Sequence, residues 1–188
     1  MAENKKKQKS GGMGVVKLLF LLFVVVVIAA VGYGLTLEEN PHFERSVVID
    51  ADKDDIHAMV GDLKQWDKWG PWRDEDPTIK YTYTEKTDEV GSKQTWTADK
   101  IGGGSLWFTK VDPETGVKYK FQYEEFEPSD GSVTYTETED GKVKVTWAFD
   151  AELGWNLPMR FIMHSSRGDM ETMFQNGLDK LKKQVEAN

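Results

Sequence analysis

A long apolar run near the N-terminus divides this chain of 188 residues into two parts. Between Gly14 and Leu35 only Lys17 and Tyr33 interrupt the apolar side chains. About 20 apolar residues, at roughly 1.5 Å rise per residue, span a hydrocarbon core of about 30 Å. We therefore predict a transmembrane helix over residues 14–36. A cleaved signal peptide is the alternative, but its apolar region is usually shorter, about 7 to 15 residues.

The charges that flank the run predict its orientation in a cell membrane. Lysines precede or open it and two glutamates follow it: Lys5, Lys6, Lys7, Lys9, Lys17, then Glu38 and Glu39. Lysine excess marks the cytoplasmic side. We predict a single-pass protein with a disordered cytoplasmic tail (1–13), a linker (37–42) and an extracytoplasmic domain (43–188). The chain has no Asn-X-Ser/Thr glycosylation site, so we expect a bacterial host.

Charge and cysteine content exclude several classes of partner and site. The chain carries 24 Lys+Arg and 32 Asp+Glu. Five of these lysines and one glutamate precede residue 37, which leaves 19 basic and 31 acidic residues, a net charge of −12. Nucleic acid repels such a domain, so we predict no nucleic-acid partner. The absence of cysteine excludes disulfides, thiolate metal ligands and a cysteine nucleophile.

Three tryptophans at three-residue spacing, Trp66, Trp69 and Trp72, form the most distinctive segment of the domain. A strand-like run at 43–49 and a short amphipathic helix lead into them. Each indole is large and apolar and carries one N–H donor, so three together need shared shelter. An ordinary core and the rim of a cavity are both possible surroundings.

After the tryptophans, turn signals recur about every 10 to 15 residues, with alternating strands between them. One face of these strands is apolar, with Ile79, Tyr81, Tyr83, Tyr119, Phe121, Tyr123, Val143, Val145, Trp147 and Phe149. This pattern predicts an antiparallel meander with one solvated face. We expect a C-terminal helix, with an apolar stripe from Met170 to Val185, to cover the apolar face of this sheet. Gly168 and Gly177 in that stripe permit close approach or bending.

Four segments carry a resemblance to a known superfamily: ERSVVIDA at 44–51, LKQWDKWGPW at 63–72, GSKQTW at 91–96 and NGLDKLKK at 176–183. With this order of elements the chain resembles the START-like (SRPBCC) superfamily, in its polyketide cyclase/dehydrase-like branch. The resemblance implies an α+β helix-grip fold, with a curved antiparallel sheet of about seven strands around a long C-terminal helix. It also implies a deep apolar cavity, because members bind lipids, sterols, polyketides or other hydrophobic molecules, and some are enzymes.

The inward positions and the resemblance together predict a ligand site. Large aromatics and flexible methionines suit an adaptable pocket, although they also suit a solid core. The predicted ligand-binding residues are Trp69, Trp72, Tyr81, Tyr83, Trp96, Tyr119, Phe121, Tyr123, Trp147, Phe161, Met170 and Phe174.

We predict no catalytic residue, no metal site and no cofactor. Of the histidines, His42 is expected in the linker, His57 on the solvated side of the first helix, and His164 near the start of the last helix. The side chains next to His164 in the sequence point in different directions around a helix or turn, so they do not converge into a Ser-His-Asp set. Ser165 or Ser166 is instead suited to cap a helix. The acidic clusters at 74–76, 88–89 and 124–125 lack the spacing of a calcium loop and are interpreted as solvated loops or exposed strand ends. Residues 102–104, three glycines, are interpreted as a flexible hairpin tip that could gate a cavity.

Three functions remain. The preferred hypothesis is a membrane-anchored binder of a hydrophobic or lipid-like small molecule, held between the sheet and the C-terminal helix. A cyclase/dehydrase-type enzyme would need a titratable pair in the same cavity, for which Tyr81, Tyr83 or Glu137 are candidates. A protein-interaction module would show a solid core and an exposed patch of the three tryptophans.

Overall fold

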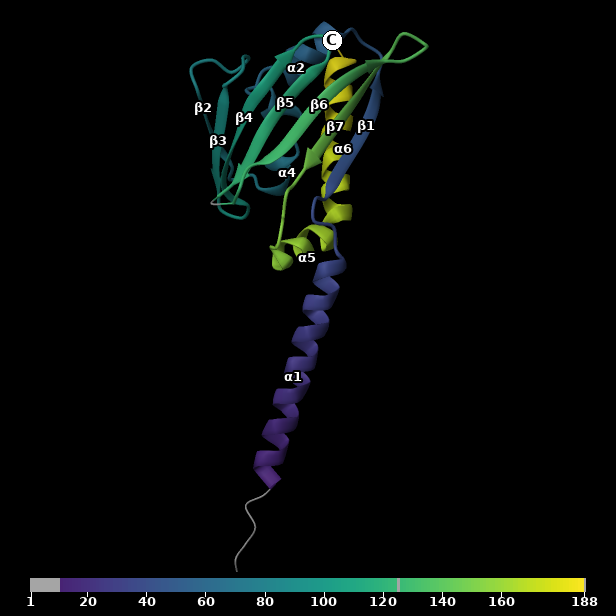
Figure 1. The fold of residues 1–188 in the computed structure, drawn as a ribbon. Helices are drawn as coiled ribbons and strands as arrows, with labels where there is room; N and C mark the ends of the chain where they lie inside the picture. Colours follow the sequence, from purple (N-terminus) through teal and green to yellow (C-terminus); the bar gives the residue numbers. More distant parts are fainter. Residues whose placement is uncertain (1–10, 125, 188) are drawn as a thin grey trace, which may run out of the picture.

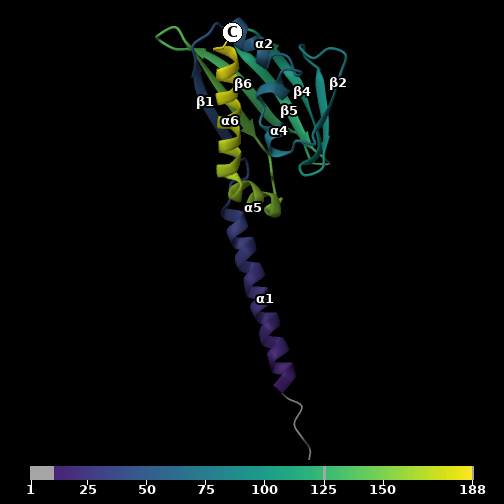
Figure 2. The same cartoon turned by 180° about the vertical axis from the view of Figure 1, so that it is seen from behind.

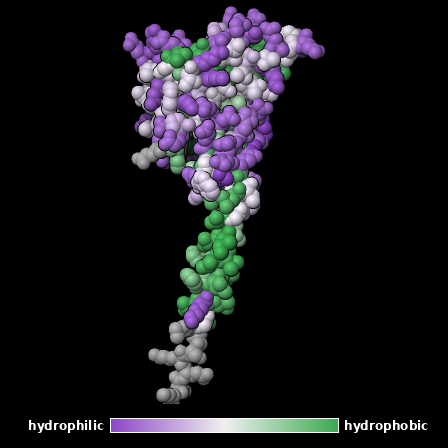
Figure 3. Space-filling view, in the orientation of Figure 1, coloured by the Kyte–Doolittle hydropathy of each residue, from purple (hydrophilic) through white to green (hydrophobic). Residues whose placement is uncertain are grey.

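The computed structural model describes residues 11–124 and 126–187. A single helix, α1 (Gly11–Thr36), projects from one end of a sheet-and-helix domain, and the C-terminus lies at the opposite end (Figure 1). Its segment from Gly14 to Thr36 is long and apolar enough to cross a membrane or to act as a signal sequence. Figure 3 shows this helix as a hydrophobic rod below a mostly hydrophilic domain. The predicted tail lies, for residues 1–10, outside the described residues.

The domain contains a seven-stranded antiparallel sheet in the order β1-β7-β6-β5-β4-β3-β2. Its strands are β1 (His42–Ile49), β2 (Lys80–Tyr83), β3 (Lys93–Ala98), β4 (Gly102–Asp112), β5 (Gly116–Tyr123), β6 (Ser129–Glu137) and β7 (Val143–Asp150). Strands β2 to β7 form the predicted meander. Strand β1 joins its far edge, with His42 opposite Asp150 and Ile49 opposite Val143.

The helices cover one face of the sheet, as the two opposite views show (Figures 1 and 2). They are α2 (Lys53–Val60), α3 (Trp66–Trp69), α4 (Trp72–Glu75) and α6 (Arg167–Val185), whereas α5 (Leu157–Ser165) lies beyond the end of the sheet, beside α1. The long helix α6 packs on β1, α2 and α3. The predicted helix-grip fold is therefore confirmed. The C-terminal helical region is divided at Ser166, which ends α5 and precedes α6 without a side-chain capping bond.

The tryptophan block belongs to the solid part of the core. The Nε1 atoms of Trp66 and Trp69 donate to the Val60 and Met59 carbonyls, at 2.7 and 3.0 Å. These bonds satisfy carbonyl groups at the C-terminal end of α2, which have no partner within the helix. The Trp66 ring also contacts five others, with centroids 5.0 to 6.2 Å away, on Trp69, Trp72, Phe108, Tyr119 and Trp147.

The same cluster anchors α6 to the sheet. The Phe174 ring stacks on Trp147 at 4.5 Å, and Trp147 Nε1 donates to the Tyr119 hydroxyl at 2.7 Å. A Cβ atom on Gly177 would lie 2.8 Å from the Trp147 ring. The predicted role of Gly177 in close approach is confirmed, because only a residue without a side chain fits there. Aromatic rings therefore fill the middle of the space between sheet and helix.

Two local predictions are wrong. Residues 102–104 are not a hairpin tip but the first residues of β4, paired with residues 96–98 of β3. Gly104 is needed there because a Cβ atom would lie 2.2 Å from the Trp96 ring. Asp76 is not a solvated loop residue: it is only 2% exposed. Its carboxylate accepts hydrogen bonds from backbone amides, and these bonds offset the free-energy cost of burying the charge.

Candidate functional site

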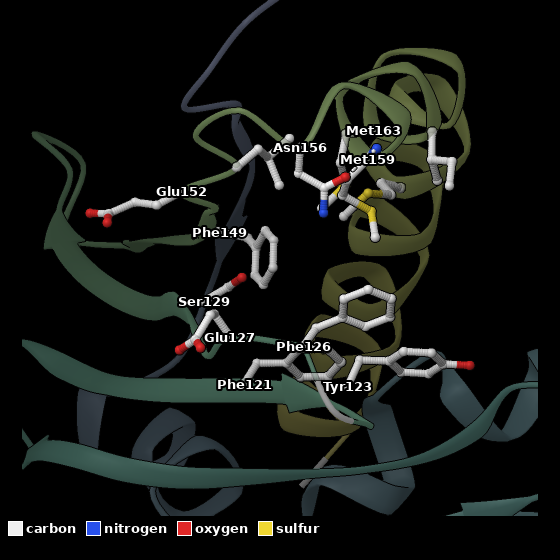
Figure 4. A pocket seen from close by; sticks show the side chains of 13 residues that line it. Phe121, Tyr123, Phe126, Glu127, Ser129, Phe149, Glu152, Asn156, Met159 and Met163 are labelled. Carbon is white, nitrogen blue, oxygen red and sulfur yellow. Dashed lines mark hydrogen bonds between the residues drawn. The ribbon is translucent and has the colours of Figure 1, made fainter.

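An apolar cavity of about 640 Å³ lies at the end of the domain nearest to α1 (Figure 4). The ends of three strands, the β5–β6 and β7–α5 connections, α5 and the start of α6 contribute its walls. The lining residues are Phe121, Tyr123, Phe126, Glu127, Ser129, Phe149, Glu152, Leu153, Asn156, Met159, Ile162, Met163 and Met170. Several of them are exposed, so the cavity opens to the surface of the protein.

Helix α5 forms the side of the cavity nearest to α1, and its sequence explains its start. The Asn156 side chain accepts a hydrogen bond from the Met159 amide at 3.2 Å, and Pro158 stands in the first turn. Both are helix-start signals. Met159, Ile162 and Met163 follow at spacings that place them on one helical face, and this face lines the cavity.

Aromatic rings form the opposite walls. In Figure 4, the side chains of Met159 and Met163 lie across the cavity from the rings of Phe126 and Phe149. The Phe126 ring stacks on Tyr123 with centroids 6.4 Å apart. Dispersion contacts with rings and thioethers are well suited to an apolar molecule of variable shape.

Polar groups are few and lie at the edge. The Tyr123 hydroxyl donates to the Ile101 carbonyl, and burial raises the pKa of Tyr123. Glu127 and Glu152 are exposed, and the Glu152 carboxylate points away from the aromatic rings (Figure 4). The residues that line the cavity include no lysine, arginine or histidine. The arrangement can therefore enclose an apolar body and accept hydrogen bonds near the mouth.

The structure brings only part of the predicted site residues to this cavity. Phe121, Tyr123 and Met170 line it. Trp96 stacks behind Phe121, with ring centroids 5.2 Å apart. Phe161 points toward α1, where its ring meets Tyr33 at 5.4 Å.

The other predicted residues lie elsewhere on the covered face. Trp69, Tyr119, Trp147 and Phe174 are buried in the aromatic core. Trp72, Tyr81 and Tyr83 are half-buried around it. Because Trp66 and Trp69 are 0% exposed, these tryptophans do not form the exposed patch expected of an interaction module.

The candidate titratable groups of an enzyme do not meet. Tyr81 and Tyr83 lie on the edge strand β2, with ring centroids 6.1 Å apart. Burial raises the pKa of both, that of Tyr83 to about 12. Glu137 ends β6, which three strands separate from β2. There Lys53 forms an ion pair with Glu137 at 2.9 Å and lowers the pKa of Glu137.

The histidines lie in three separate places. His42 begins β1, where its Nδ1 atom lies 2.7 Å from the Asp150 carboxylate, a contact that raises the pKa of His42. His57 was expected in solvent; instead it is half-buried, 3.2 Å from the Tyr135 hydroxyl, and burial lowers its pKa. His164 lies on α5 with its ring facing Tyr33. The described residues contain no cluster of three or more metal-ligating side chains.

Sequence reasoning missed most of the cavity wall, especially Met159, Ile162 and Met163. A signal was present: Asn156 and Pro158 mark a helix start, and the methionines recur at helical spacing behind it. The connection residues Phe126 and Glu127 carry no comparable pattern, since their position depends on how β5 and β6 end.

The family model described as polyketide cyclase / dehydrase and lipid transport matches residues 40–186. No curated protein sequence matches the chain.

Several solved structures share the fold at low sequence identity. A hypothetical protein from Helicobacter pylori superposes with a TM-score of 0.60 and 11% identity, covering 77% of this chain and 88% of that chain. A protein of unknown function from Staphylococcus aureus superposes with a TM-score of 0.57 and 15% sequence identity, covering 79% of this chain and 96% of that chain. Ginseng major latex-like protein 151, from Panax ginseng, superposes with a TM-score of 0.53 and 17% sequence identity, covering 79% of this chain and 99% of that chain. At these identities the likeness shows the fold alone.

Proposed function

This chain belongs to the polyketide cyclase / dehydrase and lipid transport family, and on that premise we propose that it is a membrane-anchored binding protein for a hydrophobic or lipid-like small molecule. The observation that carries the proposal is the apolar cavity of about 640 Å³ beside α5. Ligand pockets in proteins usually have volumes of about 300 to 1,000 Å³ and a mostly apolar lining. Such a space is large enough for an acyl chain or a small polycyclic molecule.

The membrane part of the proposal rests on α1. Its large apolar side chains are exposed along the helix, for example Leu18 at 66% and Ile28 at 65%. No other element of the described residues covers this surface, and a hydrocarbon core would do so. The lysines before α1 favour a cytoplasmic N-terminus and an extracytoplasmic domain. The ligand site would then stand beside the outer face of the membrane.

A cavity-filling variant tests the binding proposal. Met163→Trp places an indole in the wall of the cavity, and Asn176→Trp places the same group on the exposed side of α6. The full chain, purified in detergent micelles, is analysed by native mass spectrometry for retained lipid and titrated with a fluorescent fatty acid. We expect the wild type and Asn176→Trp to bind, and Met163→Trp to lose about tenfold or more in affinity, because overfilling excludes the probe. Equal binding by both variants, or no retained or added ligand in the wild type, would contradict the proposal.

A further inference from the structure

Helix α5 packs directly against the last turns of α1. The Tyr33 ring lies 5.4 Å from Phe161 and 6.5 Å from the His164 ring. At Gly34 the approach is closer still, since a Cβ atom would lie 3.0 Å from the Phe161 ring and 3.5 Å from Leu157. The apolar helix and the cavity wall therefore meet at one contact.

Two arginines hold the segment between α1 and β1. Arg160 is only 6% exposed; its guanidinium donates to the Leu37 carbonyl at 3.2 Å and to the Gly154 carbonyl at 2.8 Å. Arg167 pairs with Glu38 and donates to the His42 carbonyl at 3.1 Å.

Backbone bonds add to this attachment. The Leu153 amide donates to the Glu39 carbonyl at 3.0 Å, and the Ala151 amide to the Pro41 carbonyl at 3.2 Å. Because charged and backbone hydrogen bonds fix both sides of the segment, the domain has one orientation relative to α1.

Exposed apolar side chains gather at this same end. Outside α1, the described large hydrophobic residues with high exposure are Val48 at 39%, Val90 at 61%, Phe126 at 46%, Trp155 at 83% and Ile162 at 54%. Three of the five, Phe126, Trp155 and Ile162, lie in or beside the cavity wall. Trp155 is the most exposed of them, and it lies two residues before the start of α5. Such clustering marks an interaction surface rather than scattered surface apolarity.

The length of α1 determines how deep the α5 end of the domain would lie in a bilayer that α1 spans. The 23 residues from Gly14 to Thr36, at roughly 1.5 Å per residue, extend over about 34 Å, slightly more than a hydrocarbon core of about 30 Å. The last turn of α1, which carries Tyr33 and Gly34, then lies at the level of the lipid headgroups. Since α5 packs on that turn, α5 lies at the same level.

We propose that Trp155 and Ile162, named here the α5 patch, insert into the headgroup–acyl boundary of the bilayer that α1 spans, so that the cavity opens toward lipid. The inference rests on the proposed function and adds the occupant of the surface. Tryptophan favours this boundary because its ring is apolar and its N–H is polar. Ile162 both lines the cavity and is exposed, so insertion of the patch brings the mouth to the lipid.

The nearby charges specify the kind of lipid surface. Arg160 and Arg167 are paired with Glu39 and Glu38, at 3.4 Å in the first case, and the cavity rim carries Glu127 and Glu152. The end of the domain therefore offers little free positive charge to anionic lipid. Insertion depends on apolar contact, and it occurs in a zwitterionic phosphatidylcholine bilayer.

The test uses the absence of native cysteine, because any introduced cysteine is a unique labelling site. The full chain carrying Ile162→Cys is labelled with an environment-sensitive fluorophore and reconstituted in phosphatidylcholine vesicles. Val90→Cys is the matched control, with 61% exposure against 54% for Ile162. Val27→Cys reports on α1 itself, and Trp155→Cys repeats the measurement outside the helix. Spin-labelled lipids with the quencher near the headgroup or near the chain end report depth.

We expect the headgroup quencher to act on position 162 about threefold more strongly than on position 90, and the chain-end quencher to act on position 27. Quenching at 162 no stronger than at 90, with position 27 still quenched, would overturn the inference and leave the proposed function standing. A shielded but unquenched label at 162 would also overturn it, because a second copy or another protein would then cover the patch. An unquenched label at position 27 would remove the membrane placement on which both proposals rest.

Discussion

At the scale of single residues, Asp76 shows how one carboxylate joins two loops. One oxygen accepts hydrogen bonds from the Thr78 hydroxyl at 2.6 Å and the Thr78 amide at 3.0 Å. The other accepts from the amides of Lys100 at 2.6 Å and Ile101 at 3.2 Å. These bonds, that of the Thr78 hydroxyl above all, lower the pKa of Asp76 from 3.8 to about 2, because they favour the charged form.

Asp76→Asn is expected to lower the melting temperature at neutral pH, since its amide group presents N–H donors to backbone donors. The ionised carboxylate stabilises the fold fully above the ordinary pKa of 3.8, and this contribution is lost as the pH falls to about 2. The difference in melting temperature between wild type and Asp76→Asn should therefore be constant from neutral pH to about 4 and shrink below it. Circular dichroism of the full chain in detergent measures it.

The control is Asp88→Asn, in an exposed loop, which should leave the melting temperature unchanged at neutral pH. A difference for Asp76→Asn that persists undiminished to pH 2 would contradict the assigned role.

At the scale of elements, complementary side-chain packing holds α6 against the sheet. Gly177 leaves space for the Trp147 ring, which Phe174 stacks upon from the same helix. Gly168, one residue into α6, has no atom within 4 Å of its Cβ position. The two glycines in one helix thus have different surroundings.

Gly177→Ala should destabilise the fold by about 1 to 3 kcal/mol, because overpacking a rigid aromatic core forces backbone or ring shifts. Gly168→Ala is the matched control and should be neutral or slightly stabilising, within about 1 kcal/mol, since alanine favours helix. Chemical denaturation of both variants, followed by circular dichroism, measures the free energies of unfolding. Equal effects of the two substitutions would show that the clearance at Gly177 is not limiting.

Elements with a short repeat were predictable from sequence, whereas the position of the cavity and most of its lining were not. Alternation at Val143, Val145 and Trp147 reports a strand locally, because side-chain direction has a period of two. Whether an inward aromatic meets another ring or a void depends on distant residues. Trp147 is covered because Gly177, thirty positions later, lets α6 approach.

The division between α5 and α6 was likewise not predictable from local sequence patterns. The stripe from Met170 to Val185 predicted the gripping helix, but it contained no sign that a separate helix, α5, ends at Ser166 and packs on α1. The cavity follows from that bend, since it places Met159 and Met163 beyond the end of the aromatic core.

At the scale of the whole molecule, the proposed topology assigns the chain to both sides of a membrane. Lys9→Cys lies before α1, and Glu139→Cys lies in the exposed β6–β7 connection. Because lysine excess favours the cytoplasmic side, a membrane-impermeant maleimide should label Glu139→Cys in intact bacterial cells. It should label Lys9→Cys only after permeabilisation. The reverse pattern would contradict the orientation, and release of the domain into the medium would indicate cleavage after α1.

The pairing of β1 with β7 also dictates the order in which the protein can fold. His42 and Asp150 are opposite each other in the sheet, so the strand that leaves α1 first finds its partner only when the strand nearest the C-terminus has been made. Contacts of such sequence separation slow folding. Until then β1 is a free edge, open to pairing with another chain. Synthesis must therefore be nearly complete before the first strand of the domain is protected.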